Sequence, residues 1–166
     1  MKGSIYCYFQ FFSDYKVVVK EEDNMKYQGG SNFMEKSLDY FWNRWAGFPH
    51  KVTLTSPKKE PIVLEKKLPS PGSKYDFLLY QGNKIFTVEE GRDYTIPDLL
   101  FKGKETIYTM KGKINELNFF LMDKETIVSH IQGERMNGGK VYYVEGDDEL
   151  LSIGATLVLD NLYHDY

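Results

Sequence analysis

The chain has 166 residues, a formal net charge of −3 at pH 7 and a charged fraction of 27%. This length predicts a single domain, residues 1–166, with enough chain to bury a sizeable core. The acidic balance excludes a general nucleic-acid binder and argues against attraction of the whole surface to anionic lipid, although a local basic patch stays open. Cys7 is the only cysteine, so no intramolecular disulfide can form, and we expect a buried or half-buried strand residue.

The beginning of the chain does not resemble a signal peptide, because Gln10 and Asp14 interrupt a short apolar run. No segment reaches the ~20 apolar residues that a membrane-spanning helix needs. We therefore expect a cytoplasmic protein without a transmembrane segment.

Short runs of aromatic and β-branched residues follow one another along most of the chain, and an aromatic fraction of 16% suits β-strands. Ser13-Asp14 and Gln81-Gly82-Asn83 predict hairpin turns. Regular short strands without crossover helices predict an antiparallel sandwich or barrel. The predicted strands are residues 5–12, 15–20, 25–28, 50–55, 62–68, 75–80, 84–89, 105–111, 117–122, 126–132 and 140–145, with an edge strand or connection at 93–101, which contains Pro97.

One internal segment, Asn32 to Trp45, has a helical period. Leu38, Phe41, Trp42 and Trp45 fall at i, i+3, i+4 and i+7, which predicts a short helix or an irregular connection with an aromatic face. Trp42 and Trp45 are candidates for ligand stacking, for a membrane interface or for contact with a protein partner. The alternative is that the two rings plug one end of the core.

The segment from Leu150 to Leu159 carries no charge, and its apolar residues cover most of the circumference of a helix. Such a helix lies either in a membrane or at the centre of a core, and this one is too short to span a bilayer. Asp147, Asp148 and Glu149 place negative charge at its first turn, where the helix dipole favours it. The predicted fold is therefore a mainly β protein, a closed antiparallel barrel of about 12 strands around a central hydrophobic C-terminal helix.

The sequence YYVEGDDELL at residues 142–151, followed by ATLVLDNLYH at residues 155–164, resembles the end of tubby C-terminal-like domains. That superfamily also holds phospholipid scramblases, plant LURP-one-related proteins and small bacterial members, which this chain resembles most. The resemblance implies a twelve-stranded barrel around a C-terminal helix. It implies no site residues, because no position matches the lysine and arginine cluster with which tubby proteins bind phosphoinositides, and scramblase-type cysteine clusters and calcium-binding segments are absent.

No arrangement typical of an enzyme is present, and we predict a non-enzymatic protein without metal or cofactor. His50, His130 and His164 are isolated in sequence, so we expect surface or rim histidines. His164 with Asp160 and Asp165 is the best-spaced trio, since Asp160 and His164 are i and i+4 on a helix. The alternative is a histidine near a helix C-terminus, where a cation is favoured. A hydrolase acting on lipid or phosphate would need His50 or His130 beside two carboxylates.

Lysines are the remaining candidates for a binding site. They lie in pairs that the fold could bring together to hold an anionic phospholipid headgroup or a small anionic ligand, at a membrane surface if the ligand is lipid. The alternative is that they are solvated lysines at turns and strand edges. The candidate residues are Lys58, Lys59, Lys66, Lys67, Lys102 and Lys104, with a further pair at Lys111 and Lys113.

The leading hypothesis is thus a cytoplasmic binding domain for an anionic ligand. The rival hypothesis is a protein–protein interaction or homo-oligomerisation module that uses Trp42 and Trp45.

Overall fold

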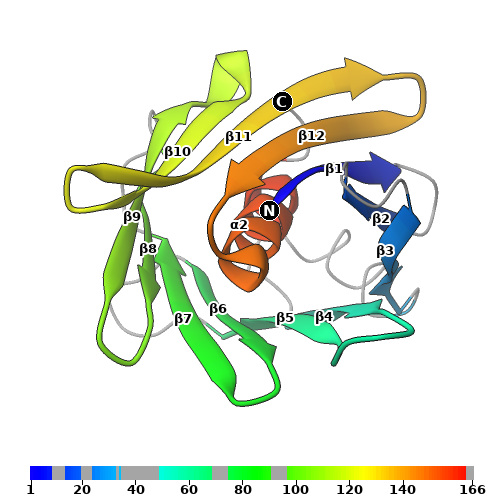
Figure 1. Ribbon diagram of the computed structural model, residues 1–166, viewed down its shortest axis with the longest axis horizontal. Helices are drawn as coiled ribbons and strands as arrows, with labels where there is room; N and C mark the ends of the chain where they lie inside the picture. Colours follow the sequence, from blue (N-terminus) through cyan, green and yellow to red (C-terminus); the bar gives the residue numbers. More distant parts are fainter. Residues whose placement is uncertain are drawn as a thin grey trace.

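A computed structural model of the chain describes residues 1–8, 14–19, 24–32, 34, 49–68, 75–90 and 97–163. Within these residues, twelve antiparallel strands form one closed barrel with a helix, α2, inside it (Figure 1). The predicted fold class is therefore confirmed. The elements are β1 (Lys2–Tyr8), β2 (Asp14–Val19), β3 (Asn24–Ser31), β4 (His50–Thr55), β5 (Ile62–Lys67), β6 (Tyr75–Gln81), β7 (Lys84–Glu90), β8 (Leu99–Lys102), β9 (Ile107–Lys113), the 3-10 turn η1 (Ile114–Glu116), β10 (Asn118–Asp123), β11 (Thr126–Met136), β12 (Gly139–Gly146) and α2 (Glu149–Leu162).

Pairing of the first strand with the last strand closes the barrel. Lys2 lies opposite Glu145 and Tyr8 lies opposite Gly139, while the other side of β1 pairs with β2. Every strand therefore has two neighbours, and no strand presents an unpaired edge.

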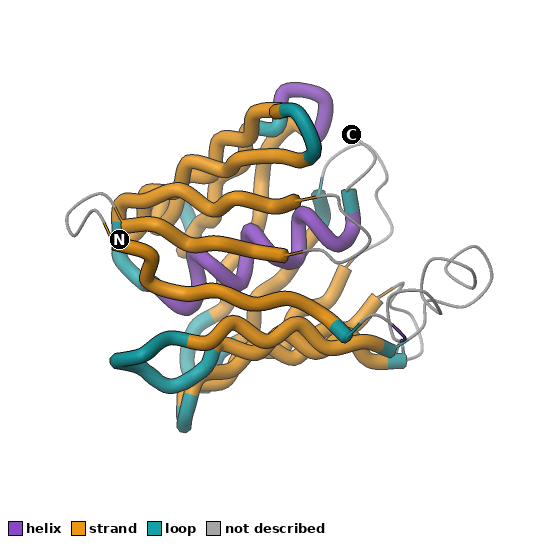
Figure 2. The backbone as a smooth tube through the Cα atoms, turned by 90° about the vertical axis from the view of Figure 1, so that its right-hand side faces the viewer, coloured by secondary structure: helices purple, strands orange, loops and turns teal. Residues whose placement is uncertain are grey.

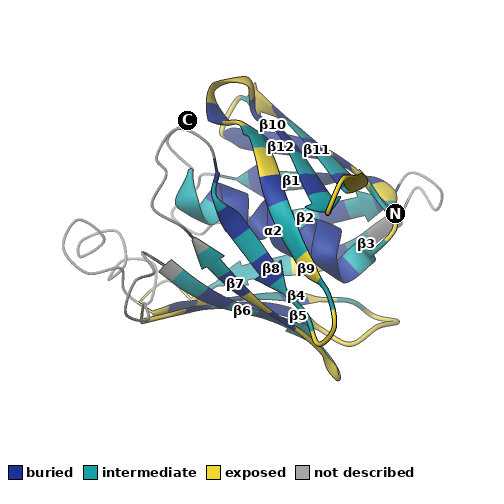
Figure 3. Cartoon of the chain, turned by 90° about the vertical axis from the view of Figure 1, so that its left-hand side faces the viewer, coloured by how far each residue is buried: buried dark blue, intermediate teal, exposed yellow. Residues whose placement is uncertain are grey.

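The alternation of side chains along each strand separates the interior from the outer surface (Figure 3). On β4, Val52 and Leu54 are buried, whereas the intervening Thr53 is only half-buried and Lys51 is exposed. Successive side chains of a strand point to opposite faces of its sheet, so each strand lines the core with every second residue.

The helix fills the interior that the strands enclose. All residues from Leu150 to Asp160 are buried, and Figure 2 shows the helix running along the inside of the barrel. Asp148 begins it as N-cap, and its carboxylate accepts a hydrogen bond of 3.1 Å from the Leu151 amide. The reading of an all-round apolar segment as a core helix is confirmed.

Local details differ from the sequence-based expectations. Asp14 pairs with Tyr8 as part of β2, so a two-residue turn formed by Ser13 and Asp14 is wrong. Pro97 precedes β8, which begins at Leu99, in agreement with a connection at that proline. The segment that contains Trp42 and Trp45 lies outside the described residues, and the expectations for it stay predictions. No helix in the described part of the chain is long and apolar enough to cross a membrane.

Candidate functional site

The two ends of the barrel have different chemistry. Because neighbouring strands are antiparallel, their connections alternate between the ends. The β4–β5, β6–β7, β8–β9 and β10–β11 connections share one end with the first turn of α2, which we call the α2 N-terminal end. The last turn of α2, η1 and the β11–β12 turn lie at the opposite end, the α2 C-terminal end.

This topology divides the candidate lysines into two groups. Lys58 and Lys59, in the β4–β5 connection, share the α2 N-terminal end with Lys102 and with Lys104, which lies between β8 and β9. Lys66 and Lys67 lie at the other end of β5. The six residues therefore do not form one patch.

Carboxylates accompany the lysines of the α2 N-terminal end. The Lys59 ammonium lies 2.9 Å from the Glu149 carboxylate, and the Lys102 ammonium lies 2.6 Å from that of Glu89. Lys58 and Lys104 are exposed, and no ion pair involves them among the described residues. Glu60 and Glu105 adjoin these lysines in sequence, so this end does not concentrate positive charge.

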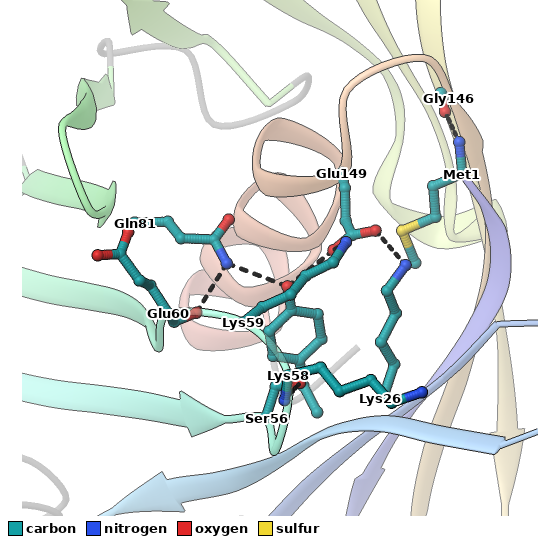
Figure 4. Close-up of polar contacts among 10 residues, drawn as sticks. Met1, Lys26, Ser56, Lys58, Lys59, Glu60, Gln81, Gly146 and Glu149 are labelled. Carbon is teal, nitrogen blue, oxygen red and sulfur yellow. Dashed lines mark hydrogen bonds and ion pairs between the residues drawn. The ribbon is translucent and has the colours of Figure 1, made fainter.

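Glu149 is the centre of the polar contacts at the α2 N-terminal end. Its carboxylate accepts from the ammonium groups of Lys26 and Lys59 and, at 2.7 Å, from the Tyr27 hydroxyl (Figure 4). Burial alone would raise the pKa of Glu149, but these hydrogen bonds outweigh it and hold the pKa below its usual value. Gln81 donates to the Tyr27 oxygen at 3.0 Å and to the Glu60 carbonyl at 2.7 Å, which ties β3 to the β4–β5 connection. These hydrogen bonds join the first turn of α2 to β3, β6 and the β4–β5 connection.

The α2 C-terminal end has a polar interior on one side of the barrel. Six strands that are consecutive around the barrel, β12 and β1 to β5, each contribute one polar side chain near this end, which together we call the polar arc. Lys140, Cys7, Tyr15, His50 and Lys66 are each at most 5% exposed. The Ser31 hydroxyl oxygen is also buried. The polar arc consists of Lys140, Cys7, Tyr15, Ser31, His50 and Lys66.

The last turn of α2 supplies partners for the polar arc. The Tyr15 hydroxyl donates to the Asp160 carboxylate at 3.0 Å. His50 Nε2 lies 2.6 Å from the Asn161 side-chain oxygen, and the Lys140 ammonium donates to the Tyr163 carbonyl at 2.8 Å. Three members of the polar arc therefore contact the end of the helix: Tyr15, His50 and Lys140.

Asp160 holds two tyrosine hydroxyls as donors. Tyr142, on β12, donates to Asp160 at 3.3 Å, in addition to Tyr15. Burial, followed by the nearby Asp160 charge, raises the pKa of both tyrosines well above the usual value. Both hydroxyls therefore stay protonated at neutral pH and stabilise the buried carboxylate.

Buried cations are the unusual part of the polar arc. The Lys140 ammonium lies at the helix C-terminus, where the dipole favours positive charge. Lys66 lies opposite His50 in the register of β4 and β5, and both residues are buried, so their side chains share the inner face of the wall. Chemically, this arrangement can hold an anionic group whose oxygens accept hydrogen bonds from Lys66 and His50.

Several expectations are corrected here. His50 is buried rather than at the surface, and Lys66, at 4% exposed, is not a solvated lysine. Lys140 and Tyr15 were missed, although strand alternation would have placed Lys140 on the inward face with Tyr142. Asp160 was considered only beside His164. Cys7 is a buried strand residue, as predicted.

His130 is the other histidine among the residues that the structure describes. His130 lies on β11, where its ring stacks on Phe120 with centroids 4.6 Å apart and its Nε2 lies 2.8 Å from the Asn118 oxygen. His164 lies outside the described residues. Among those that are described, no group of three or more histidine, cysteine, aspartate or glutamate side chains is placed to hold a metal ion.

Comparison with known proteins adds no assignment to this geometry. No family model, curated protein or solved structure matches the chain. The resemblance to tubby C-terminal-like domains stays a prediction.

Proposed function

We propose that this chain is a non-enzymatic binding domain that takes an anionic group, either a phospholipid headgroup or a small free anion, at the α2 C-terminal end. The observation that carries the proposal is the pair formed by Lys66 and His50 inside the barrel wall. Buried ionisable groups gathered at one place are typical of functional sites.

The charges of the described interior favour an anion over a cation. Lys66 and Lys140 bring two positive charges to the polar arc, and Asp160 brings one negative charge. The Asp160 carboxylate already accepts from two tyrosine hydroxyls. Lys140 contacts the helix terminus, whereas Lys66 lies opposite His50, so Lys66 is the lysine that we place in the proposed site.

The resemblance to tubby C-terminal-like domains supports a binding role through the shared architecture only. The phosphoinositide-binding cluster of tubby proteins has no counterpart in this sequence, and the proposed site uses residues of this chain alone. Fold by itself does not imply function.

Binding measurements on matched lysine variants test the proposal. Inorganic phosphate and glycerol 3-phosphate serve as free anions, and vesicles of phosphatidylserine with phosphatidylcholine serve as the lipid surface. We expect wild type to bind either the free anions or the vesicles. Lys67→Met should bind the same probe as tightly as wild type, because Lys67 is exposed. Lys66→Met should bind about tenfold more weakly or worse, since a charged hydrogen bond is worth about 1.5–3 kcal/mol.

The pattern of results distinguishes the sources. Binding of phosphate without vesicles identifies a small free anion, and binding of vesicles without phosphate identifies a headgroup. Absence of binding to every probe at low salt, or equal binding by Lys66→Met and wild type, would overturn the proposal. His50→Gln provides a second variant if Lys66→Met does not fold.

A further inference from the structure

The side chain of Asn161 fixes which ring nitrogen of His50 carries a hydrogen. The Asn161 amide nitrogen lies 3.1 Å from the Leu157 carbonyl oxygen, which can only accept a hydrogen bond. The side-chain oxygen of Asn161 lies 2.6 Å from His50 Nε2. Because that oxygen also only accepts, Nε2 carries a hydrogen and donates it to Asn161.

This tautomer decides what His50 offers to an anion. Since Nε2 donates to Asn161, an anion oxygen that accepts from the imidazole accepts from Nδ1. In the neutral ring with its hydrogen on Nε2, Nδ1 has a lone pair and no hydrogen, so it repels such an oxygen. A second proton gives Nδ1 a hydrogen and makes the ring a cation, which can donate a charged hydrogen bond.

The charges near His50 favour binding of the second proton together with an anion. Lys66 lies directly opposite His50 in the register of β4 and β5, where Cβ atoms are about 4.5–5.5 Å apart. An imidazolium and an ammonium so close repel each other, and an anion between them offsets the repulsion. The other titratable groups that the described elements gather at this end of the interior are Lys140 and Tyr142 on β12, Cys7 on β1, Tyr15 on β2 and Asp160 on α2. Among these residue types, only histidine usually changes charge between about pH 5 and 8.

We infer that an anion bound between Lys66 and His50 takes up a proton on His50, so that the site binds its ligand more tightly in acid. The inference rests on the proposed function, because it concerns the same site. Proton and anion each raise the affinity of the site for the other, since coupling between two bound ligands is reciprocal. The affinity falls by at most about tenfold for each rise of one pH unit, because a single proton accompanies each anion.

Titration calorimetry with sulfate at about pH 5.5 and about pH 8 spans the range in which histidine usually changes charge. Sulfate keeps both of its charges throughout, and vesicles of phosphatidylglycerol with phosphatidylcholine serve in the same way if the site takes a headgroup. We expect wild type to bind its probe about tenfold more tightly, or better, at the lower pH.

Two histidine variants assign the pH dependence to one residue. His50→Gln keeps an amide donor for Asn161 but does not titrate, so it should bind the probe weakly and equally at both pH values. His130→Gln is the matched control, because His130 lies on β11, which contributes no residue to the polar arc. It should keep the pH dependence of wild type.

Calorimetry of wild type in two buffers with different heats of ionisation counts the protons taken up, and this measurement needs no variant to fold. Equal affinity of wild type at both pH values, no net proton uptake over this range, or a pH dependence in His50→Gln like that of wild type would overturn the inference. When Lys66→Met still binds more weakly than wild type, these results leave the proposed site intact. Absence of binding to every probe would overturn the proposed function and the inference together.

Discussion

Lys66 and Lys67 are adjacent in sequence but lie on opposite faces of the barrel wall. Lys66 is 4% exposed and continues the inward row of Ile62 and Leu64, whereas Lys67 is exposed. One pair of lysines therefore contributes one cation to the interior and one to the surface. Lysines grouped by their closeness in sequence are thus separated by strand alternation, and only Lys66 belongs to the proposed anion site.

The buried Tyr142 hydroxyl should contribute measurably to stability. Tyr142→Phe removes a hydrogen bond to the Asp160 carboxylate and should lower the free energy of unfolding by about 1.5 kcal/mol. The neighbouring Tyr143 is 41% exposed and points to the outer surface. Tyr143→Phe should therefore change the free energy of unfolding by less than about 0.5 kcal/mol. Urea denaturation of both variants measures the difference, and equal effects would contradict the burial of Tyr142.

Stability should depend on the ionisation of Glu149. Its folded-state pKa lies below the usual 4.5, so its ion pairs stabilise the fold above that pH and are lost as the pH falls through the folded-state pKa. At pH 7, Glu149→Gln should therefore lower the free energy of unfolding by about 1–3 kcal/mol. The difference in the free energy of unfolding between wild type and Glu149→Gln should become smaller at acidic pH. Thermal unfolding measured over a range of pH tests this.

An exposed ion pair provides the comparison for Glu149. Lys2 and Glu145 lie 3.2 Å apart with side chains 55% and 65% exposed. Glu145→Gln should change the free energy of unfolding by less than about 1 kcal/mol at any pH, because solvent screens such pairs. A pH profile of Glu149→Gln parallel to that of wild type would refute the role of the Glu149 network.

Two substitutions of Asp148 should separate its capping role from its ion pair. Asp148 caps α2 by accepting from the Leu151 amide, and it also pairs with Lys84. Asp148→Asn keeps a capping oxygen and loses the charge, so it should lower the free energy of unfolding by less than about 1 kcal/mol. Asp148→Ala loses both contacts and should cost about 1–2 kcal/mol. Chemical denaturation compares them, and an equally large loss in both would assign the effect to the ion pair.

Gly154 lets the helix approach β6 closely. A Cβ atom at this position would lie 2.0 Å from a methyl carbon of Leu79, which is fully buried. Gly154→Ala should therefore lower the free energy of unfolding by about 1–3 kcal/mol, although alanine favours a helix by about 1 kcal/mol in an open site. In a double-mutant cycle with Leu79→Ala, the combined loss should be smaller than the sum of the two.

The architecture was predictable because its signals are local and repetitive. The strand at His50 to Thr55 was predicted with the bounds that the structure shows, since polar and apolar residues alternate there. The helix was predicted because no amphipathic surface element contains so long an uncharged stretch. Asp14 was misplaced, because an Asp beside Ser resembles a turn, whereas in the structure it is the first residue of β2 and pairs with Tyr8.

Lys66 was predicted to bind an anion as part of a group of lysines, whereas His50 and Asp160 were considered for other chemistry. Lys140 and Asp160 are charged, so their type favours the surface, yet the fold buries both. Strand alternation predicts the inward direction of Lys140, but no local pattern contains its contact with the end of α2 or the contact of Asp160 with Tyr15 on β2. His50 and Lys66 become neighbours only when β4 pairs with β5.

Pairing of β1 with β12 sets the order in which the molecule can assemble. Lys2 and Glu145 meet only after the intervening strands have been made, and α2 follows β12 in the chain. On a ribosome, the earlier hairpins would emerge with apolar inner faces and no helix to pack against them. Contacts so distant in sequence make folding slow, and nascent strands with open edges are prone to aggregate. The order of the elements therefore leaves the inner faces of the strands without the helix that covers them until the last part of the chain is made.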